Sequence, residues 1–194
     1  MATLQNEGDK VNLANKISIA RIILIPFFIA SIVYNRIEIA LALFILAVIS
    51  DGVDGFIARS LDQKTKLGTI LDPLADKMLL LSAYICLSIA SSIPSSLRLP
   101  PYVPIIVISR DAIIVLGSIM IHIITGDLKV APSAWGKITT FFQMMTIVSV
   151  LTKFNYPYIV WNVTAALTVV SGIGYVMKGS RILSENHTII KRAG

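Results

Sequence analysis

Long apolar runs, separated by short polar or proline-containing breaks, dominate this chain. They cover roughly residues 17–35, 38–58, 67–94, 102–126, 133–152 and 157–178. A helix needs about 20 predominantly apolar residues to cross the hydrocarbon core of a bilayer, and each run is near that length. The pattern therefore predicts an all-α, polytopic membrane protein with six transmembrane helices. A polar tail and a short helix on the membrane surface are expected within residues 1–16.

The composition is also that of a membrane protein. Of the 194 residues, 55% are hydrophobic and 14% are charged, and the mean hydropathy is +0.79. A soluble domain carries about 25% charged residues. Six spans leave no room for a soluble domain of ordinary size, so we expect a single integral-membrane domain over residues 1–194. The single cysteine, Cys86, excludes an intrachain disulfide.

The basic residues predict an orientation. The formal net charge is +6, but no basic stripe with interleaved aromatic residues is present, so we expect no nucleic-acid partner. Most basic residues at the span ends share a side with the N-terminus, whereas Arg36, Arg98 and Lys153 are expected on the opposite side. The positive-inside rule then places both termini in the cytoplasm, with the protein in the cell's inner membrane among its lipids.

Four aspartates interrupt the second and third apolar runs. Asp51 and Asp54 lie three residues apart, which separates them by about 60° around a helix. Asp72 and Asp76 lie four residues apart, one above the other on the next helix. The spacing therefore predicts that four carboxylates converge on one gap, at the cytoplasmic ends of these two helices.

A bound cation would offset the repulsion between these carboxylates and the cost of placing them near hydrocarbon. The ligand set is all oxygen, without a nearby Cys or His, which favours Mg²⁺ or Mn²⁺ over Zn²⁺. Four aspartates have enough oxygens for two such ions. Small residues surround them, and their missing side chains would admit a phosphate ligand: Gly52, Gly55, Ala58 and Gly68. Arg59 is expected to bind that phosphate.

Two other interpretations of the acidic residues exist. A single aspartate in a membrane helix often pairs with a lysine, and Lys77 is close in sequence. A divalent-cation channel or transporter also carries acidic residues inside the membrane. Arg59 argues against a conduction path, as do the largely apolar outer halves of the second and third helices.

The acidic segment reads D-x-x-D-G-x-x-A-R, eight residues, then G-x-x-x-D-x-x-x-D. The specified positions are Asp51, Asp54, Gly55, Ala58, Arg59, Gly68, Asp72 and Asp76. This pattern resembles the signature of the CDP-alcohol phosphatidyltransferase family. The resemblance implies that an alcohol hydroxyl attacks the lipid-linked phosphorus of a CDP-activated donor and that CMP leaves. It also implies two metal ions on the four aspartates, Asp76 as the general base, and a homodimer.

The first apolar run contributes further polar residues. Asn15, Ser18 and Arg21 recur every three residues and lie within an arc of about 120° on one side of a helix. We expect this side to contact the nucleotide or diphosphate, although a helix entry with a snorkelling arginine has the same pattern. The predicted donor site adds the following residues of the acidic segment: Gly52, Asp54, Gly55, Ala58, Arg59 and Gly68.

Three basic residues form the predicted acceptor site. Arg110, Lys137 and Arg181 lie in or next to the last three apolar runs and are expected to bind the phosphate of a phosphorylated alcohol. A simple ion pair between Arg110 and the adjacent Asp111 is the alternative. The segment S-x-x-G-K-x-x-T-x-x-Q at residues 133–143, with an upstream S-R-D, resembles the bacterial phosphatidylglycerophosphate synthases, whose acceptor is sn-glycerol 3-phosphate. One departure is Thr139, where those synthases often carry a second lysine, so we expect the phosphate pocket to differ in detail. Inositol phosphate, serine or a phospholipid stay open as alternative acceptors.

Overall fold

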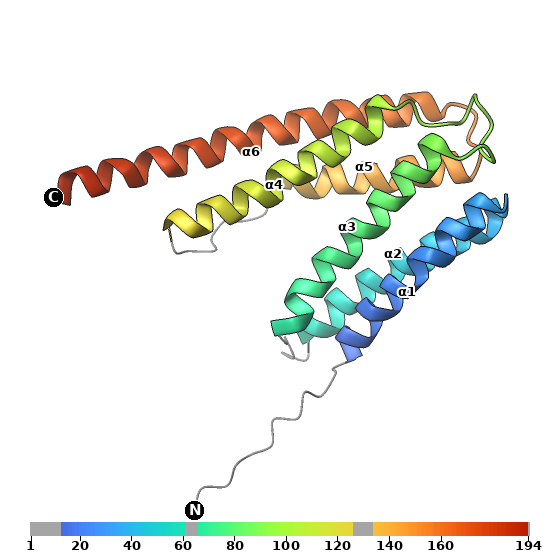
Figure 1. Ribbon diagram of the computed structural model, residues 1–194, viewed down its shortest axis with the longest axis horizontal. Helices are drawn as coiled ribbons and strands as arrows, with labels where there is room; N and C mark the ends of the chain where they lie inside the picture. The colour runs from blue at the N-terminus through green and yellow to red at the C-terminus, as the bar shows by residue number, and fades with distance from the viewer. Residues whose placement is uncertain (1–12, 61–65, 126–133, 194) are drawn as a thin grey trace, which may run out of the picture. The chain divides into compact units, whose positions relative to one another are not determined.

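The computed structural model describes the backbone of residues 13–60, 66–125 and 134–193, and side chains over 19–50, 77–118, 120 and 135–180. Every regular element in these ranges is an α-helix (Figure 1). The helices are α1 (Leu13–Val33), α2 (Ile37–Ser60), α3 (Lys66–Ile89), α4 (Tyr102–Thr125), α5 (Ala134–Leu151) and α6 (Pro157–Ala193). The predicted all-α class is therefore confirmed, and each helix coincides with one apolar run.

The helix ends differ from the apolar boundaries at three places. Residues 13–16, expected in a separate surface helix, continue without a break into α1, while residues 10–12 lie outside the described part. Helix α3 stops at Ile89, ahead of Pro94 and its serine-rich surroundings, although the apolar run continues to 94. Helix α6 extends to Ala193, well past the apolar end at 178. Hydropathy marks where a helix meets a polar environment, whereas the backbone hydrogen bonds continue until a breaking residue stops them.

Two helices end in left-handed caps that lack glycine. Asn35 has a φ of 59° after α1, and Lys153 has a φ of 54° after α5. In each case the backbone N–H of the following residue donates to a carbonyl in the last turn of the helix. Arg36 donates to the Ser31 carbonyl at 2.7 Å, and Phe154 donates to the Ser149 carbonyl at 2.9 Å. These bonds satisfy carbonyls that the helix end leaves open and turn the chain sharply into the next helix.

The chain forms two compact units, and the first holds residues 1–86 and 90–92. Within it, α1 and α2 pack side by side as an antiparallel pair (Figure 1). Their buried apolar residues recur every three or four positions, as in Phe28 and Ile32 of α1 and Ala40 and Phe44 of α2. The Phe28 and Phe44 rings lie 6.1 Å apart between centroids. This packing holds the α2 segment that leads to the first two aspartates.

The second unit holds residues 87–89 and 93–194, with α4 and α5 both packed against α6. Helix α4 runs parallel to α6, and α5 runs antiparallel to both (Figure 1). Several hydroxyl and amide side chains of α5 and α6 are buried: Thr139, Gln143, Thr146, Thr164, Thr168 and Ser171. Some of them lie in the α5–α6 contact. Thr146 and Thr164 hydrogen-bond across it at 2.7 Å. Buried hydroxyls between helices with apolar outer faces are typical of packing in lipid.

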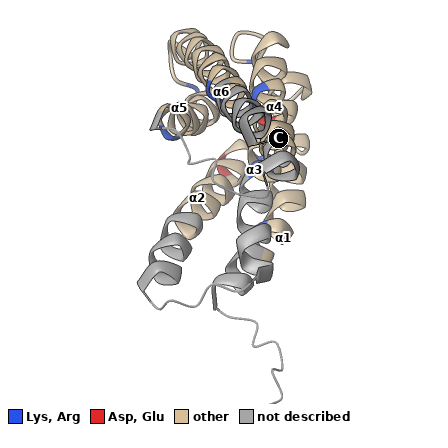
Figure 2. Ribbon diagram, turned by 90° about the vertical axis from the view of Figure 1, so that its left-hand side faces the viewer, with Lys and Arg blue, Asp and Glu red and all other residues tan. Residues whose placement is uncertain are grey.

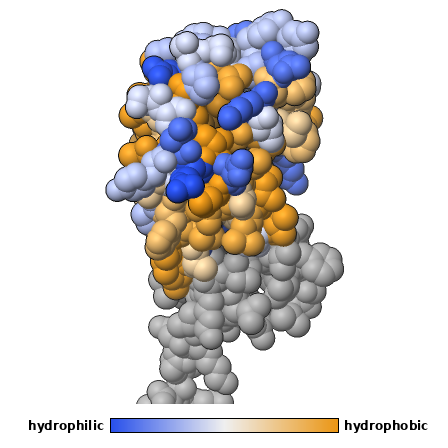
Figure 3. All heavy atoms as spheres, turned by 90° about the vertical axis from the view of Figure 1, so that its right-hand side faces the viewer, coloured by the Kyte–Doolittle hydropathy of each residue, from blue (hydrophilic) through white to orange (hydrophobic). Residues whose placement is uncertain are grey.

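The outer surfaces are rich in hydrophobic side chains. In the face drawn in Figure 3, exposed hydrophobic residues lie beside the hydrophilic ones. Charged residues are sparse on the described helices (Figure 2). Among the described residues, one helical stretch, Pro157–Ser180, is both long and apolar enough to cross a membrane. Shorter apolar stretches occur at Ile19–Val33, Ile37–Ser50 and Lys77–Ile89.

Candidate active site

The acidic segment lies on two successive helices. Residues 51–59 occupy the last turns of α2 (Ile37–Ser60), and residues 68–76 occupy the first turns of α3 (Lys66–Ile89). The helical spacing assumed for Asp51 with Asp54, and for Asp72 with Asp76, is therefore present in the backbone. The side-chain surroundings of the eight motif positions and of Gly52 lie outside the described part. Convergence of the four carboxylates stays a prediction.

The donor set of this segment fits a hard divalent cation. No cluster of three or more His, Cys, Asp or Glu residues occurs among the side chains that the structure describes, and the four aspartates are not among these. Carboxylate oxygens are ligands that Mg²⁺ and Mn²⁺ accept. The metal site at Asp51, Asp54, Asp72 and Asp76 stays a prediction.

Arg21 of α1 is buried rather than snorkelling. Its side chain is 1% exposed, although an arginine that snorkels would extend its guanidinium into solvent. A buried guanidinium needs polar or anionic surroundings. Its contact with the nucleotide or diphosphate stays a prediction. Asn15 and Ser18 lie on the same helix, and their side chains lie outside the described residues.

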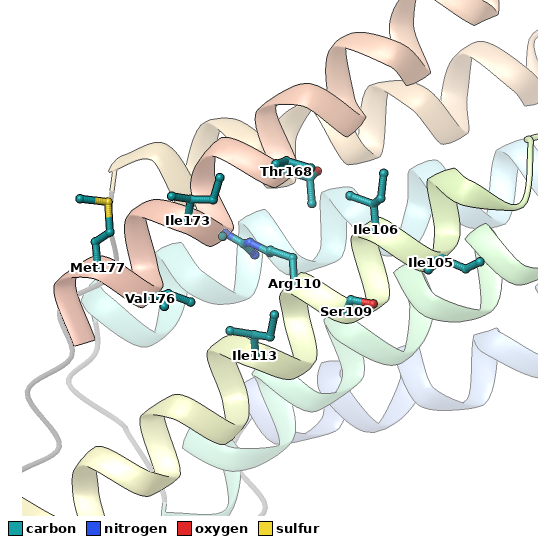
Figure 4. Close-up of a pocket in the computed structure, with 11 residues that line it drawn as sticks. Ile105, Ile106, Ser109, Arg110, Ile113, Thr168, Ile173, Val176 and Met177 are labelled. Atoms are coloured by element: carbon teal, nitrogen blue, oxygen red, sulfur yellow. The ribbon is translucent and has the colours of Figure 1, made fainter. Parts of the chain in front are cut away.

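Arg110 of α4 is the best-described residue of the predicted acceptor site. Its side chain is 7% exposed, and its Nη1 donates to Oδ1 of the adjacent Asp111 at 2.7 Å. Its Nη2 donates to Oγ of Ser171 on α6 at 3.0 Å. Figure 4 shows the guanidinium extending from α4 towards α6. The ion pair with Asp111 is thus present, and it occupies one of the two terminal nitrogens.

Two glycines give Arg110 its room. A Cβ at Gly172 of α6 would lie 3.5 Å from Cγ of Arg110, so the stem of the arginine rests on the helix backbone there. A Cβ at Gly136 of α5 would lie 3.2 Å from Nη2. The guanidinium therefore lies where α4, α5 and α6 meet, beside the first turn of α5.

The structure gives fewer contacts for the other two residues of the predicted acceptor site. Lys137 follows Gly136 on α5, and its side chain is exposed. Arg181 lies on α6, but its side chain is outside the described part. Ser171 and Gly172 were not found from the sequence, because a serine and a glycine within an apolar run carry no signal of a distant arginine.

A groove opens between α4 and α6 beside Arg110 (Figure 4). It encloses about 420 Å³, and its lining is apolar apart from Ser109, Arg110 and Thr168. Such walls suit a hydrocarbon chain better than a sugar phosphate. The site thus combines a buried arginine, ion-paired with Asp111, with an apolar groove.

The model of the family described as CDP-alcohol phosphatidyltransferase matches residues 11–173. The chain belongs to this family. It is therefore a transferase of phospholipid biosynthesis, and the family is membrane-associated and uses divalent metal ions. The matched range contains the whole acidic segment together with Arg21, Arg110 and Ser171.

Curated relatives of the enzyme cover nearly its full length. A protein of Bacillus subtilis named CDP-diacylglycerol--glycerol-3-phosphate 3-phosphatidyltransferase is 35% identical, over 91% of this chain and 99% of the relative. A protein of the same name from Aquifex aeolicus is 30% identical, over 89% of this chain and 98% of the relative. Human cardiolipin synthase (CMP-forming) is 30% identical, over 86% of this chain and 61% of the relative.

Proposed function

We propose that this enzyme transfers the phosphatidyl group of CDP-diacylglycerol to sn-glycerol 3-phosphate, giving phosphatidylglycerophosphate and CMP. The names of the bacterial relatives support this choice of substrates over nearly the whole chain. The observation that carries the proposal is the buried guanidinium of Arg110, which is held where α4, α5 and α6 meet. A fixed cation that belongs to none of the acidic-segment residues can bind the phosphate of a phosphorylated alcohol.

The guanidinium of Arg110 has an N–H donor that the described residues leave without an acceptor. The described residues supply acceptors to Nη1 and Nη2 of Arg110 but none to Nε, which is buried. A buried N–H without an acceptor costs about 1–3 kcal/mol, and a bound phosphate oxygen would remove that cost. Lys137 and Arg181 would add charge from α5 and α6. Arginine suits this role because its planar guanidinium can donate two hydrogen bonds to one phosphate.

The proposed reaction is based on the family and its motif residues. Asp51, Asp54, Asp72 and Asp76 would hold two Mg²⁺ or Mn²⁺ ions. Such ions neutralise a diphosphate and stabilise charge on a leaving phosphate. The primary hydroxyl of glycerol 3-phosphate forms a bond to the phosphatidyl phosphorus, and the bond from that phosphorus to the bridging oxygen of CMP breaks. Asp76 accepts the hydroxyl proton, and CMP leaves with the electron pair of the broken bond.

The donor would be held by α1 and by the acidic segment. Arg21, with Asn15 and Ser18 on the same helix, would contact the diphosphate or nucleotide of CDP-diacylglycerol. Arg59 would bind a phosphate oxygen, and the following small residues would let the donor approach the backbone: Gly52, Gly55, Ala58 and Gly68.

The protein would lie in the inner membrane as a homodimer of single-domain chains, each with six spans and both termini in the cytoplasm. The apolar stretch of α6 and the many exposed hydrophobic side chains support burial in lipid. The distribution of lysine and arginine supports the orientation. The acidic segment would then face the cytoplasm, where a soluble acceptor is available and into which CMP is released.

A phospholipid is the second candidate acceptor. The apolar groove beside Arg110 would accommodate an acyl chain, and human cardiolipin synthase (CMP-forming) is among the relatives. Both candidate acceptors carry a phosphate group and a hydroxyl. Only the phospholipid has acyl chains that would enter the groove.

The test is CMP release by detergent-purified enzyme supplied with CDP-diacylglycerol and Mg²⁺. Glycerol 3-phosphate, phosphatidylglycerol, serine and inositol phosphate are added separately, and lipid products are identified by mass. We expect release with glycerol 3-phosphate, loss of release with EDTA, and a loss of at least about a hundredfold in Asp76→Asn. Glu38→Gln removes an exposed carboxylate at the start of α2 and should leave the rate unchanged. Activity with phosphatidylglycerol alone would replace the proposed acceptor with a phospholipid.

A further inference from the structure

We propose that Ser171 is a positioning residue that fixes the guanidinium of Arg110 for the acceptor phosphate; this rests on the acceptor site proposed above. Ser171 lies on α6, is 7% exposed and accepts a hydrogen bond from Nη2 of Arg110 at 3.0 Å. The two residues are 61 positions apart in the chain, so the bond links separate helices.

The guanidinium is held at both of its ends. Asp111 accepts from Nη1 at 2.7 Å, and Ser171 accepts from Nη2. Because a guanidinium is planar, acceptors on both terminal nitrogens determine the orientation of the whole group. The backbone at Gly172 lies against the aliphatic stem of Arg110. The side chain therefore cannot rotate or withdraw without losing these contacts. Orienting the group before the substrate arrives lowers the entropic cost of binding.

The chemistry of the two acceptors differs in a way that suits an anion site. Asp111 already supplies one negative charge beside Arg110. A second carboxylate at position 171 would make the cluster net negative and would repel a phosphate. A serine hydroxyl holds Nη2 without adding charge, so the guanidinium is fixed while its attraction for an anion is kept.

A purely structural role for the bond is the competing explanation, and the molecule offers a matched control for it. Ser118 of α4 and Tyr175 of α6 also hydrogen-bond between the same two helices, with 2.8 Å between Oγ and the phenol oxygen. The bond does not involve Arg110. Ser118→Ala and Ser171→Ala therefore each remove one serine hydroxyl from the α4–α6 contact, and only the second affects the guanidinium.

The experiment measures KM and kcat for each substrate, together with the thermal unfolding midpoint, in the purified enzyme. We expect Ser171→Ala to raise the KM for glycerol 3-phosphate about tenfold, as loss of one charge-assisted hydrogen bond would. The kcat and the KM for CDP-diacylglycerol should stay within about twofold. Ser118→Ala should change none of the kinetic constants, whatever it does to the midpoint. In an Arg110→Lys background, Ser171→Ala should add no further increase in the acceptor KM.

The inference is overturned if Ser171→Ala leaves the acceptor KM unchanged, or raises the KM of both substrates together. If the alanine variant does not fold, Ser171→Cys keeps the size of the side chain but exchanges the hydroxyl for a weak acceptor, and the same KM increase is expected. Failure of the proposed function has a separate signature, because the unsubstituted enzyme would then release no CMP with glycerol 3-phosphate. That result would overturn both proposals.

Discussion

Tyr175 of α6 lies across Gly117 of α4, so that a Cβ at position 117 would be 2.9 Å from Cε1 of the tyrosine ring. The phenol is anchored at the same time, because it hydrogen-bonds with Ser118 at 2.8 Å and donates to the Ile114 carbonyl at 3.1 Å. The ring therefore cannot move aside without losing polar contacts. This contact brings the parallel helices α4 and α6 together on the C-terminal side of Arg110.

Gly117→Ala should destabilise the protein. The added methyl group would displace the Tyr175 ring, and overpacking of this kind costs about 1–3 kcal/mol. A higher helix propensity offsets up to about 1 kcal/mol of that. We expect a lower midpoint of thermal unfolding, measured by circular dichroism on the detergent-solubilised protein.

Gly174 is the control for this substitution, since a Cβ there would meet nothing within 4 Å. Gly174→Ala should raise the midpoint through helix propensity alone, by the equivalent of about 0.5–1 kcal/mol. If Gly117→Ala raised the midpoint as much as Gly174→Ala, close packing of Tyr175 on Gly117 would be disproved.

Lys153→Gly should stabilise the protein. Lys153 has a φ of 54°, and a side chain in the left-handed region costs about 1–2 kcal/mol. Glycine removes this strain but loses more entropy on folding, so a net gain of about 0.5–1 kcal/mol is expected in thermal unfolding. Asn35→Gly, at the equivalent cap with a φ of 59°, should gain less because asparagine tolerates this region. A lower midpoint for Lys153→Gly would contradict the cap geometry.

Gly136→Ala should weaken binding of the acceptor. The new Cβ would be 3.2 Å from Nη2 of Arg110, so the guanidinium must shift by a few tenths of an ångström. Because displacements of about 1 Å cost up to a hundredfold, we expect the KM for glycerol 3-phosphate to rise roughly threefold. Gly172→Ala places its Cβ 3.5 Å from Cγ of the same arginine, an ordinary contact, and should leave the KM unchanged. Equal effects of the two alanines would argue against a guanidinium fixed beside α5.

The predicted orientation is testable by cysteine labelling, because Cys86 is the single cysteine. Asn155 lies in the connection between α5 and α6, and Lys178 lies near the C-terminal end of the apolar stretch of α6; both are exposed. In a Cys86→Ala background, a membrane-impermeant maleimide added to spheroplasts should label Asn155→Cys and should label Lys178→Cys only after lysis. The opposite pattern would reverse the proposed topology.

Much of this molecule follows from short-range features of the sequence. The length of each apolar run predicts a helix, and the spacings of Asp51 with Asp54 and of Asp72 with Asp76 correspond to helical turns in α2 and α3. These features are readable because helical hydrogen bonds join residues four positions apart. The ends of α3 and α6 were predicted less well, because polarity changes at a membrane boundary without ending a helix.

The sequence by itself determined the all-α class, the positions of the helices and the family signature. Only the tertiary structure decided that α4 and α6 run side by side, that Arg110 binds Ser171 as well as Asp111, and that Gly136 and Gly172 make room for it. The physical reason is one of range. Helix formation depends on neighbours within a few residues, whereas a contact across 61 positions depends on how whole helix surfaces fit together.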